Sequence, residues 1–224
     1  MWSGKIEDYI LYEDKNIIVC HKPAGLAVQN ARIGSADMES VLKNYLYKKE
    51  PGTMPYLGIV HRLDQPVEGI IVFARTPFAA KELSRQISGG QMEKIYLAVT
   101  KEKPDKEEGV LEDYLKKDGR TNTSAVVAEG TPGAKKARLF YQVIHEETER
   151  FLIKIKLDTG RHHQIRVQMA HAGMPLTGDR KYGGGTDTAL GLCACSLTFL
   201  YPGSRKKMHF TVKPKGEAFK NFSL

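Results

Sequence analysis

Short strand-like segments outnumber helix-like segments along this chain, and the two kinds do not alternate regularly. Segments with strand character occur at residues 16–20, 70–73, 95–99, 110–115, 125–128, 137–144, 151–157, 192–200 and 208–212. Regular strand–helix alternation is typical of parallel α/β sheets, and its absence favours an α+β fold. We therefore expect a mixed, largely antiparallel central sheet with flanking helices and loops.

Three segments have helical character. The first is centred on residues 38–46, with Ser35 or Asp37 available as its N-cap. The second covers residues 77–87, where Thr76 is the expected cap and a proline takes the first helical position. The third opens after residues 158–160 and continues to Gly173. A chain of 224 residues has the length of one well-buried domain, so we expect a single domain over residues 1–224.

The chain is basic. It has 34 Lys and Arg against 26 Asp and Glu, which gives a net charge of +8, and its pI is about 9.3. An excess of this size favours a polyanionic partner such as nucleic acid, although a role in solubility alone gives the same composition. Charge by itself does not distinguish DNA from RNA.

Several classes of protein are disfavoured by the sequence. Apolar runs are far shorter than the roughly 20 residues that span a bilayer, and the amino terminus lacks the pattern of a signal peptide. Three cysteines, two of them in Cys193-x-Cys195, give neither a disulfide framework nor a zinc-finger spacing. We therefore expect a cytoplasmic protein without a membrane segment.

The segment His61-Arg62-Leu63-Asp64 places charged side chains between two apolar stretches. One interpretation is structural, since Asp64 could cap a turn ahead of Pro66. A kinase catalytic loop is excluded, because that motif reads His-Arg-Asp and the other kinase motifs are missing.

Two later segments also combine polar groups with regular structure. In Lys94-Ile95-Tyr96-Leu97-Ala98 a tyrosine alternates with apolar residues, and Gly160-Arg161-His162-His163-Gln164-Ile165-Arg166 concentrates hydrogen-bonding side chains. Adjacent residues on a helix diverge by about 100°, so the paired histidines are poorly placed to share an ion. No metal-ligand spacing accompanies them, and we expect no metal site.

Together these segments resemble the RluA-like family of RNA pseudouridine synthases. The resemblance extends from about residue 11 to residue 212. It rests on the His61–Asp64 segment with the strand after it, on Lys94-x-Tyr96-x-Ala98, and on the stretch from Gly160 to Val167. The continuation His171-x-Gly173-x-Pro175-Leu176-x-Gly178-Asp179, followed by Tyr182-Gly183, belongs to the same pattern.

The resemblance implies the pseudouridine synthase catalytic fold and an isomerisation of uridine to pseudouridine that needs no cofactor. Asp64 corresponds to the catalytic carboxylate, Arg166 to the residue that pairs with it, and Tyr96 to the aromatic that stacks on the flipped base. Expected RNA-binding residues are Arg62, which fills the gap left by the flipped base, with His61, Arg161, His163 and Gln164. For His163 and Gln164 a structural hydrogen bond beneath the cleft is the alternative.

The implied partner is ribosomal or transfer RNA, bound by a monomer without an obligate protein partner or the amino-terminal RNA-binding domain of many relatives. Val67-Glu68 stands where relatives usually carry Thr-Ser or Thr-Thr, and Gln65 where many carry a basic residue. These departures bear on the choice of RNA. A catalytically inactive RNA-binding protein of the same fold is the alternative, whereas a glycosidase would usually need a pair of acids.

Overall fold

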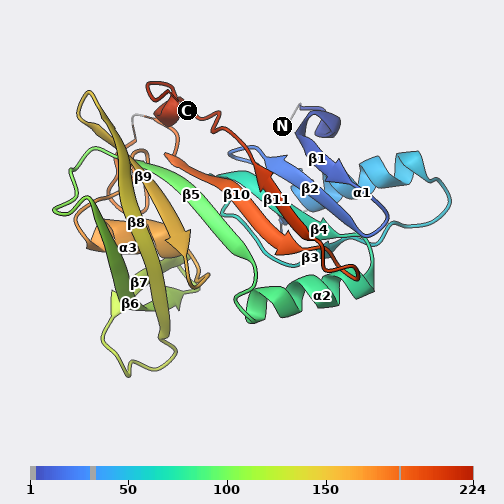
Figure 1. The fold of residues 1–224 in the computed structure, drawn as a ribbon, viewed down its shortest axis with the longest axis horizontal. Helices are drawn as coiled ribbons and strands as arrows, with labels where there is room; N and C mark the ends of the chain where they lie inside the picture. The colour runs from blue at the N-terminus through green and yellow to red at the C-terminus, as the bar shows by residue number, and fades with distance from the viewer. Residues whose placement is uncertain (1–3, 31–33, 187, 224) are drawn as a thin grey trace. The chain divides into compact units, whose positions relative to one another are not determined.

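The computed structural model describes residues 4–30, 34–186 and 188–223, and the chain forms two compact units. The first unit comprises Met1–Glu93 and Ala194–Val212, and the second comprises Lys94–Cys193 and Lys213–Leu224. Each unit is built on antiparallel strands (Figure 1).

The first unit contains a sheet whose strands run in the order β1-β2-β4-β10-β11, with β3 paired to β4. The strands are β1 (Ile10–Glu13), β2 (Ile17–Lys22), β3 (Gly58–Ile59), β4 (Glu68–Ala74), β10 (Leu192–Leu200) and β11 (Lys207–Thr211). The pairs β1–β2, β2–β4, β3–β4 and β10–β11 are antiparallel. Because β2 and β4 are central, every residue of both strands is buried.

Two helices accompany this sheet, and both begin at caps that the sequence predicts. Helix α1 (Met38–Lys49) has Asp37 as its N-cap, whose side chain accepts a hydrogen bond from the Ser40 backbone in a capping box. Helix α2 (Pro77–Ser88) is capped by Thr76, which accepts a hydrogen bond from the Ala79 backbone. A short 3₁₀ helix, η1 (Ile6–Tyr9), precedes β1.

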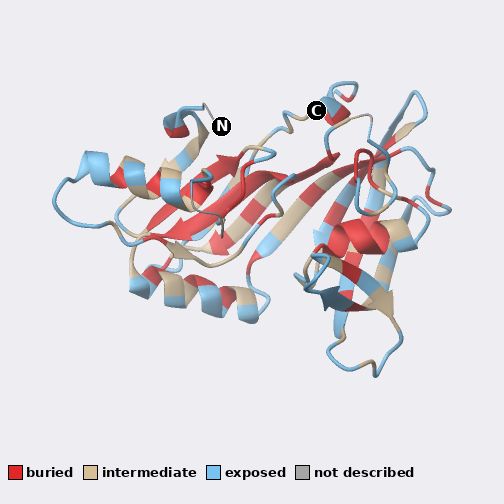
Figure 2. Ribbon diagram, turned by 180° about the vertical axis from the view of Figure 1, so that it is seen from behind, coloured by how far each residue is buried: buried red, intermediate tan, exposed pale blue. Residues whose placement is uncertain are grey.

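The core of the first unit follows from side-chain alternation along its strands. Ile17 and Val19 of β2 pack with Ile70 and Val72 of β4 in a cluster that includes Leu83 of α2. The intervening residues of β2 are also fully buried, so both faces of the strand are covered. Buried positions in Figure 2 accordingly run along the central strands, while α1 and α2 expose one side each.

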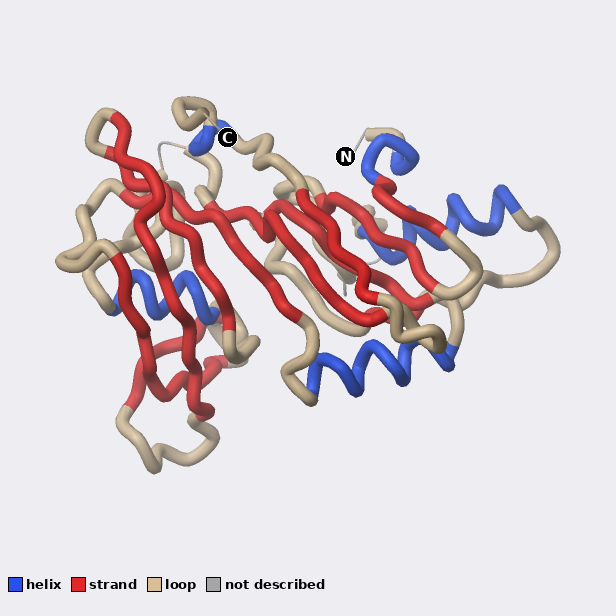
Figure 3. The backbone as a smooth tube through the Cα atoms, in the orientation of Figure 1, coloured by secondary structure: helices blue, strands red, loops and turns tan. Residues whose placement is uncertain are grey.

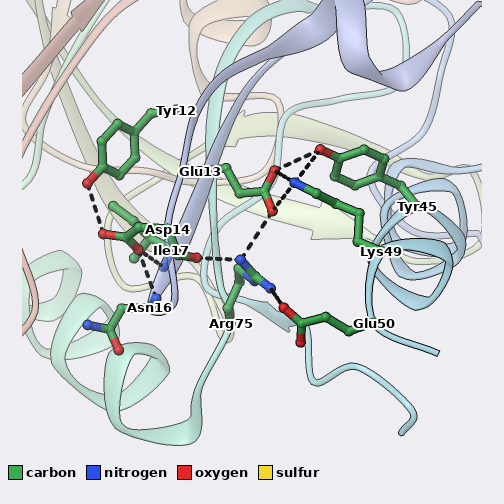
Figure 4. Close-up of polar contacts among 9 residues, drawn as sticks. All are labelled: Tyr12, Glu13, Asp14, Asn16, Ile17, Tyr45, Lys49, Glu50 and Arg75. Carbon is green, nitrogen blue, oxygen red and sulfur yellow. Dashed lines mark hydrogen bonds and ion pairs between the residues drawn. The ribbon is translucent and has the colours of Figure 1, made fainter. Parts of the chain in front are cut away.

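A network of hydrogen bonds and ion pairs surrounds Glu13, the last residue of β1 (Figure 4). The Glu13 carboxylate accepts hydrogen bonds from Tyr45 at 2.8 Å and from Lys49 at 3.0 Å, both on α1. It also pairs with Arg75 at 3.2 Å, just after β4. One carboxylate therefore joins β1, α1 and the end of β4.

The second unit contains strands in the order β5-β9-β8-β6-β7, in which every neighbouring pair is antiparallel (Figure 3). Its strands are β5 (Glu93–Thr100), β6 (Glu108–Asp118), β7 (Thr123–Val127), β8 (Lys135–Glu147) and β9 (Arg150–Leu157). Helix α3 (Gln164–His171) contacts β6 and β7, and its Val167 packs with Leu115 and Ala137. A second 3₁₀ helix, η2 (Glu217–Phe219), follows β11 in the chain.

The expected α+β class with largely antiparallel strands is confirmed, and the expected strands and helices all occur. Two short strands, β1 and β3, were not expected from the sequence, since four and two residues are too few for a clear period. The third helix begins only at Gln164, because His163 before it adopts a left-handed backbone with φ 53°. In the described residues, no helix combines the length and apolar character required to cross a membrane.

Gly69 provides a test of how closely the strands of the first unit approach. Its φ is +128°, and a Cβ atom there would lie 2.5 Å from the backbone N and O of Ala194 in β10. We expect Gly69→Ala to lower the free energy of unfolding by about 3 kcal/mol or more, because it combines backbone strain with a clash. Chemical denaturation would measure this.

Gly119 supplies the matched control for that substitution. A Cβ atom at Gly119 would meet no atom within 4 Å, and its φ is not positive. Gly119→Ala should therefore change stability by less than about 0.5 kcal/mol, as is usual for surface positions. Equal effects of the two substitutions would contradict the close approach of β4 and β10.

Candidate active site

The segment expected to carry the nucleophile forms the loop between β3 and β4. Leu63 is buried and fixes the loop on the core, whereas Arg62 is exposed and Asp64 is half-buried. The Asp64 carbonyl accepts a hydrogen bond from the Val67 backbone at 3.0 Å, which closes a turn. The loop thus exposes Arg62 and part of Asp64 on a backbone that buried Leu63 and the Val67–Asp64 hydrogen bond hold in place.

His61, which was expected to bind RNA, has an internal contact. Its Nε2 accepts a hydrogen bond from the backbone N–H of Val72 in β4 at 3.2 Å. The ring is half-buried. His61 therefore fixes the start of the loop to the neighbouring strand.

Lys22, at the end of β2, fixes the loop more strongly. Its side chain is fully buried, and its Nζ donates hydrogen bonds to the carbonyls of Leu26 at 2.7 Å, Pro23 at 2.9 Å and Gln65 at 3.1 Å. Three carbonyl acceptors match the three N–H groups of an ammonium. The residue immediately after Asp64 is therefore tied to the loop that follows β2.

The charge of Lys22 is balanced by its surroundings. Burial lowers the pKa of Lys22 to about 7, and the negative charges of Asp64 and Glu68 oppose that shift. Glu68 is itself buried, and one of its carboxylate oxygens lies 3.5 Å from Nε2 of the buried His21. The turn that carries Asp64 thus packs against three buried ionisable groups, those of Lys22, His21 and Glu68.

Sequence reasoning missed Lys22 and His21 as parts of the site, and it noted Glu68 only as a departure from the family pattern. The available signal was a histidine and a lysine that continue an apolar strand directly into Pro23. A charged residue inside a buried strand needs partners, and here the partners are backbone carbonyls that no sequence pattern indicates.

Tyr96 lies on β5 in the second unit, opposite Ile155 of β9. It is 6% exposed, so most of the ring is packed and little of it reaches solvent. Alternation places Lys94 on the same side of β5 as Tyr96. Burial lowers the pKa of Lys94 to about 8.

Arg166 lies on α3 and forms a buried, two-pronged ion pair. Its Nε and Nη2 donate to Oδ2 and Oδ1 of Asp179, both at 2.7 Å. The guanidinium also lies over the Tyr182 ring, 5.2 Å from its centroid. Arg166 therefore joins α3 to the segment that contains Asp179. Sequence analysis included Asp179 in the family pattern but assigned it no function.

Gln164, the first residue of α3, and Arg161 ahead of it both bond to other groups of the protein. Gln164 is buried, and its Oε1 accepts hydrogen bonds from Thr159 at 2.8 Å and from the Arg161 backbone at 2.9 Å. Arg161 is exposed, and its Nε donates to the Lys136 carbonyl at 2.8 Å. Of the two, only Arg161 lies at the surface.

The two histidines precede α3, so the expectation that they diverge on a helix was wrong. Their rings stack with centroids 3.8 Å apart and 24° between planes. Nδ1 of His163 lies 2.8 Å from the Tyr182 hydroxyl, and Nδ1 of His162 lies 2.9 Å from Ser124 Oγ. His163 is 7% exposed, which places it beneath the surface.

Asp64 belongs to the first unit, whereas Tyr96 and Arg166 belong to the second. That these three side chains line one cleft, with Asp64 paired to Arg166, stays a prediction.

Comparison with known proteins assigns the chain to a family. The family model described as RNA pseudouridylate synthase matches residues 16–171. An uncharacterized RNA pseudouridine synthase of Zymomonas mobilis is 32% identical over 179 residues, which is 80% of this chain and 80% of that protein.

Longer relatives are also similar. Ribosomal large subunit pseudouridine synthase D of Xylella fastidiosa is 34% identical over 205 residues, and its namesake in Nitrosomonas europaea is 38% identical over 177 residues. These alignments cover 91% and 78% of this chain. The chain spans only 60% and 49% of those two relatives' own lengths.

Solved structures show the same fold. The human protein titled RNA Pseudouridylate Synthase Domain Containing 4 superposes with a TM-score of 0.79 at 23% identity, over 94% of this chain and 90% of that one. This likeness establishes a common fold.

The Arg166–Asp179 pair gives a testable energetic expectation. Asp179→Leu removes the carboxylate that accepts both 2.7 Å bonds from the buried Arg166 guanidinium, and we expect it to lower the free energy of unfolding by about 3–5 kcal/mol. The double change Arg166→Met with Asp179→Leu should cost much less, since it removes both buried charges. A double-mutant cycle by chemical denaturation measures the coupling, and independent, additive effects would contradict the pair.

Proposed function

Because the chain belongs to the RNA pseudouridylate synthase family, we propose that it converts a specific uridine of structured ribosomal or transfer RNA to pseudouridine. The observation that carries the proposal is the half-buried Asp64, held on a turn that buried Lys22 fixes from below. A fixed carboxylate at a surface loop is what attack at a ribose carbon requires.

In the proposed reaction the bond between ribose C1′ and uracil N1 breaks, the base rotates, and C5 takes the place of N1. C5 loses its proton and N1 gains one, so the reaction is an isomerisation without redox change. Asp64 acts either by attack on C1′ or by removal of a ribose proton. The carboxylate must be ionised in both cases, and we assign Arg166 the role of favouring that charge.

The target base must leave its stack to reach Asp64. Arg62 is exposed beside Asp64, and its planar guanidinium is suited to fill the gap in the RNA. We assign Tyr96 to stacking on the displaced uracil. Because His163 and Gln164 are buried and bonded to protein groups, we assign them to support of the α3 start.

Exposed cations of the second unit offer a surface for the phosphate backbone. They lie on β6, on the turn after it and at the start of β8: Lys116, Lys117, Arg120 and Lys135. Arg161 is exposed and contacts the adjacent Lys136 carbonyl. We propose that residues 1–224 form a single catalytic domain that acts as a monomer in the cytoplasm and needs no metal, cofactor or obligate protein partner.

Asp64→Asn tests the chemistry. The substitution preserves shape and removes charge, and we expect the rate of pseudouridine formation to fall on the order of 10⁴-fold, with RNA binding kept. Asp105→Asn, at an exposed position, is the control and should keep full activity. Residual activity of Asp64→Asn within tenfold of wild type would refute the role. A wild-type protein that binds RNA but forms no pseudouridine would instead favour an inactive RNA-binding protein.

Salt dependence tests the binding mode. Each phosphate contact contributes about −0.7 to −0.9 to the slope of log affinity against log salt concentration. We expect a slope of several units, and a slope smaller by about one unit for Arg161→Ala. The control is Arg85→Ala on α2, where the side chain pairs with Glu82. Binding that is indifferent to salt would show that the net charge has no part in RNA recognition.

A further inference from the structure

His162 has no part in the proposed function, yet its side chain connects the segment before α3 to the hairpin formed by β6 and β7. Its Nδ1 lies 2.9 Å from Oγ of Ser124 on β7, and its Nε2 lies 3.2 Å from Oδ1 of Asn122 in the turn between the two strands. The ring is half-buried, so part of it reaches the surface. Figure 1 shows α3 beside β6 and β7, which brings the two segments together.

These hydrogen bonds require a proton on both ring nitrogens of His162. Ser124 Oγ donates its single proton to the His162 carbonyl at 2.9 Å, so it faces Nδ1 as an acceptor. Oδ1 of Asn122 is a carbonyl oxygen, which can only accept a proton from Nε2. An imidazole that donates from both nitrogens is a cation.

The stacked ring of His163 is neutral by the same reasoning. The Tyr182 hydroxyl accepts a hydrogen bond from the Ser124 backbone at 2.8 Å, and it donates its own proton to Nδ1 of His163 at 2.8 Å. A histidine that accepts at Nδ1 carries no charge. Its face lies 3.8 Å from the His162 ring, with 24° between the planes, and an aromatic face stabilises an adjacent cation.

A second cation converges on the same asparagine. Nζ of Lys181 donates to the Asn122 carbonyl at 2.7 Å, while His162 meets the side chain of that residue. Lys181 is exposed, and within the ranges that the structure describes no carboxylate is paired with it. Like charges held at one residue repel each other, so this arrangement favours the binding of an anion.

Exposed arginines accompany this pair of cations. Arg161 directly precedes His162, and Arg120 lies in the hairpin turn, where its backbone donates to Asp118 at 2.8 Å. We call the four cations that surround Asn122 the hairpin cluster: Arg120, Arg161, His162 and Lys181. Because they come from three separate segments of the chain, they suit a ligand with several anionic groups in a row, such as the phosphates of an RNA strand.

We propose that the hairpin cluster binds the phosphate backbone of the RNA, and that His162 must be protonated for full affinity. The inference rests on the proposed function, because it takes RNA as the partner. It makes His162 and Lys181 RNA-binding residues and makes the affinity depend on pH.

The charge of His162 depends on opposing neighbours. The other titratable or charged groups near it are Arg161, His163, Lys181 and Tyr182, with Asp118 and Arg120 in the turn. The adjacent cations oppose its proton, whereas Ser124 and Asn122 accept from the protonated ring. Histidine ordinarily changes charge between pH 5 and 8, so measurements at about pH 5.5 and 8.5 compare the two states.

The test begins by mapping the modified uridine in total RNA from strains with and without the protein. Binding of the full chain to a stem-loop that carries this uridine is then measured over a range of salt concentrations at both pH values. For wild type, we expect the slope of log affinity against log salt to be steeper by about 0.7–0.9 at the lower pH, since one phosphate contact contributes that amount.

His162→Gln should show the shallower slope at both pH values, because glutamine donates a hydrogen bond but carries no charge. His209→Gln is the matched control: Nδ1 of His209 also lies 2.8 Å from a hydroxyl, that of Thr198, and this variant should keep the pH difference. Lys181→Gln should make the slope shallower by about 0.7–0.9 at both pH values. Thermal unfolding at both pH values establishes that each variant folds.

The outcomes separate the two proposals. Equal slopes of wild type at the two pH values overturn the inference, and so does a pH difference that persists in His162→Gln. An unchanged slope in Lys181→Gln overturns it as well, because the cluster then binds no phosphate. In each of these cases pseudouridine formation by wild type leaves the proposed function standing, whereas a wild type that forms no pseudouridine in any RNA overturns the proposed function itself.

Discussion

The bonds from the Lys22 ammonium to three backbone carbonyls are the interaction on which the first unit's site depends. A fully buried amine is costly unless its donors are satisfied, and the carbonyls of Pro23, Leu26 and Gln65 satisfy all three. Since those carbonyls belong to two separate loops, the buried charge joins the segment after β2 to the turn of Asp64.

The second unit uses a buried cation in a different way. Arg166 meets a carboxylate, Asp179, through two parallel bonds at 2.7 Å, and this pairing connects α3 to the glycine-rich segment beyond it. A Cβ atom on Gly184 would lie 1.7 Å from the Leu176 carbonyl, so the chain there can fold tightly only with glycine. Together these constraints give Arg166 a fixed position and orientation on α3.

Burial separates the roles of the residues that the motifs brought together. Arg62 and Arg161 are exposed and can meet an RNA strand, whereas His163 and Gln164 are enclosed by protein partners. The polar clusters of the sequence therefore divide into exposed side chains and buried side chains that are bonded to the protein. The change from exposed Arg161 to buried His163 takes place just before α3, where His163 adopts a left-handed backbone.

The sequence alone determined the α+β class, the helix cap at Thr76 and the family, because periodicity, capping preferences and ordered motifs are local patterns. For the first helix it left Ser35 and Asp37 as alternative caps, and the structure shows Asp37. The sequence could not indicate β1 or β3, which are too short to show a period, nor the late start of α3. Only tertiary structure decided that Lys22 lies under Asp64 and that Asp179 holds Arg166. Those contacts depend on backbone carbonyls and on residues distant in the chain, and a linear pattern carries no information about which carbonyl a buried charge will meet.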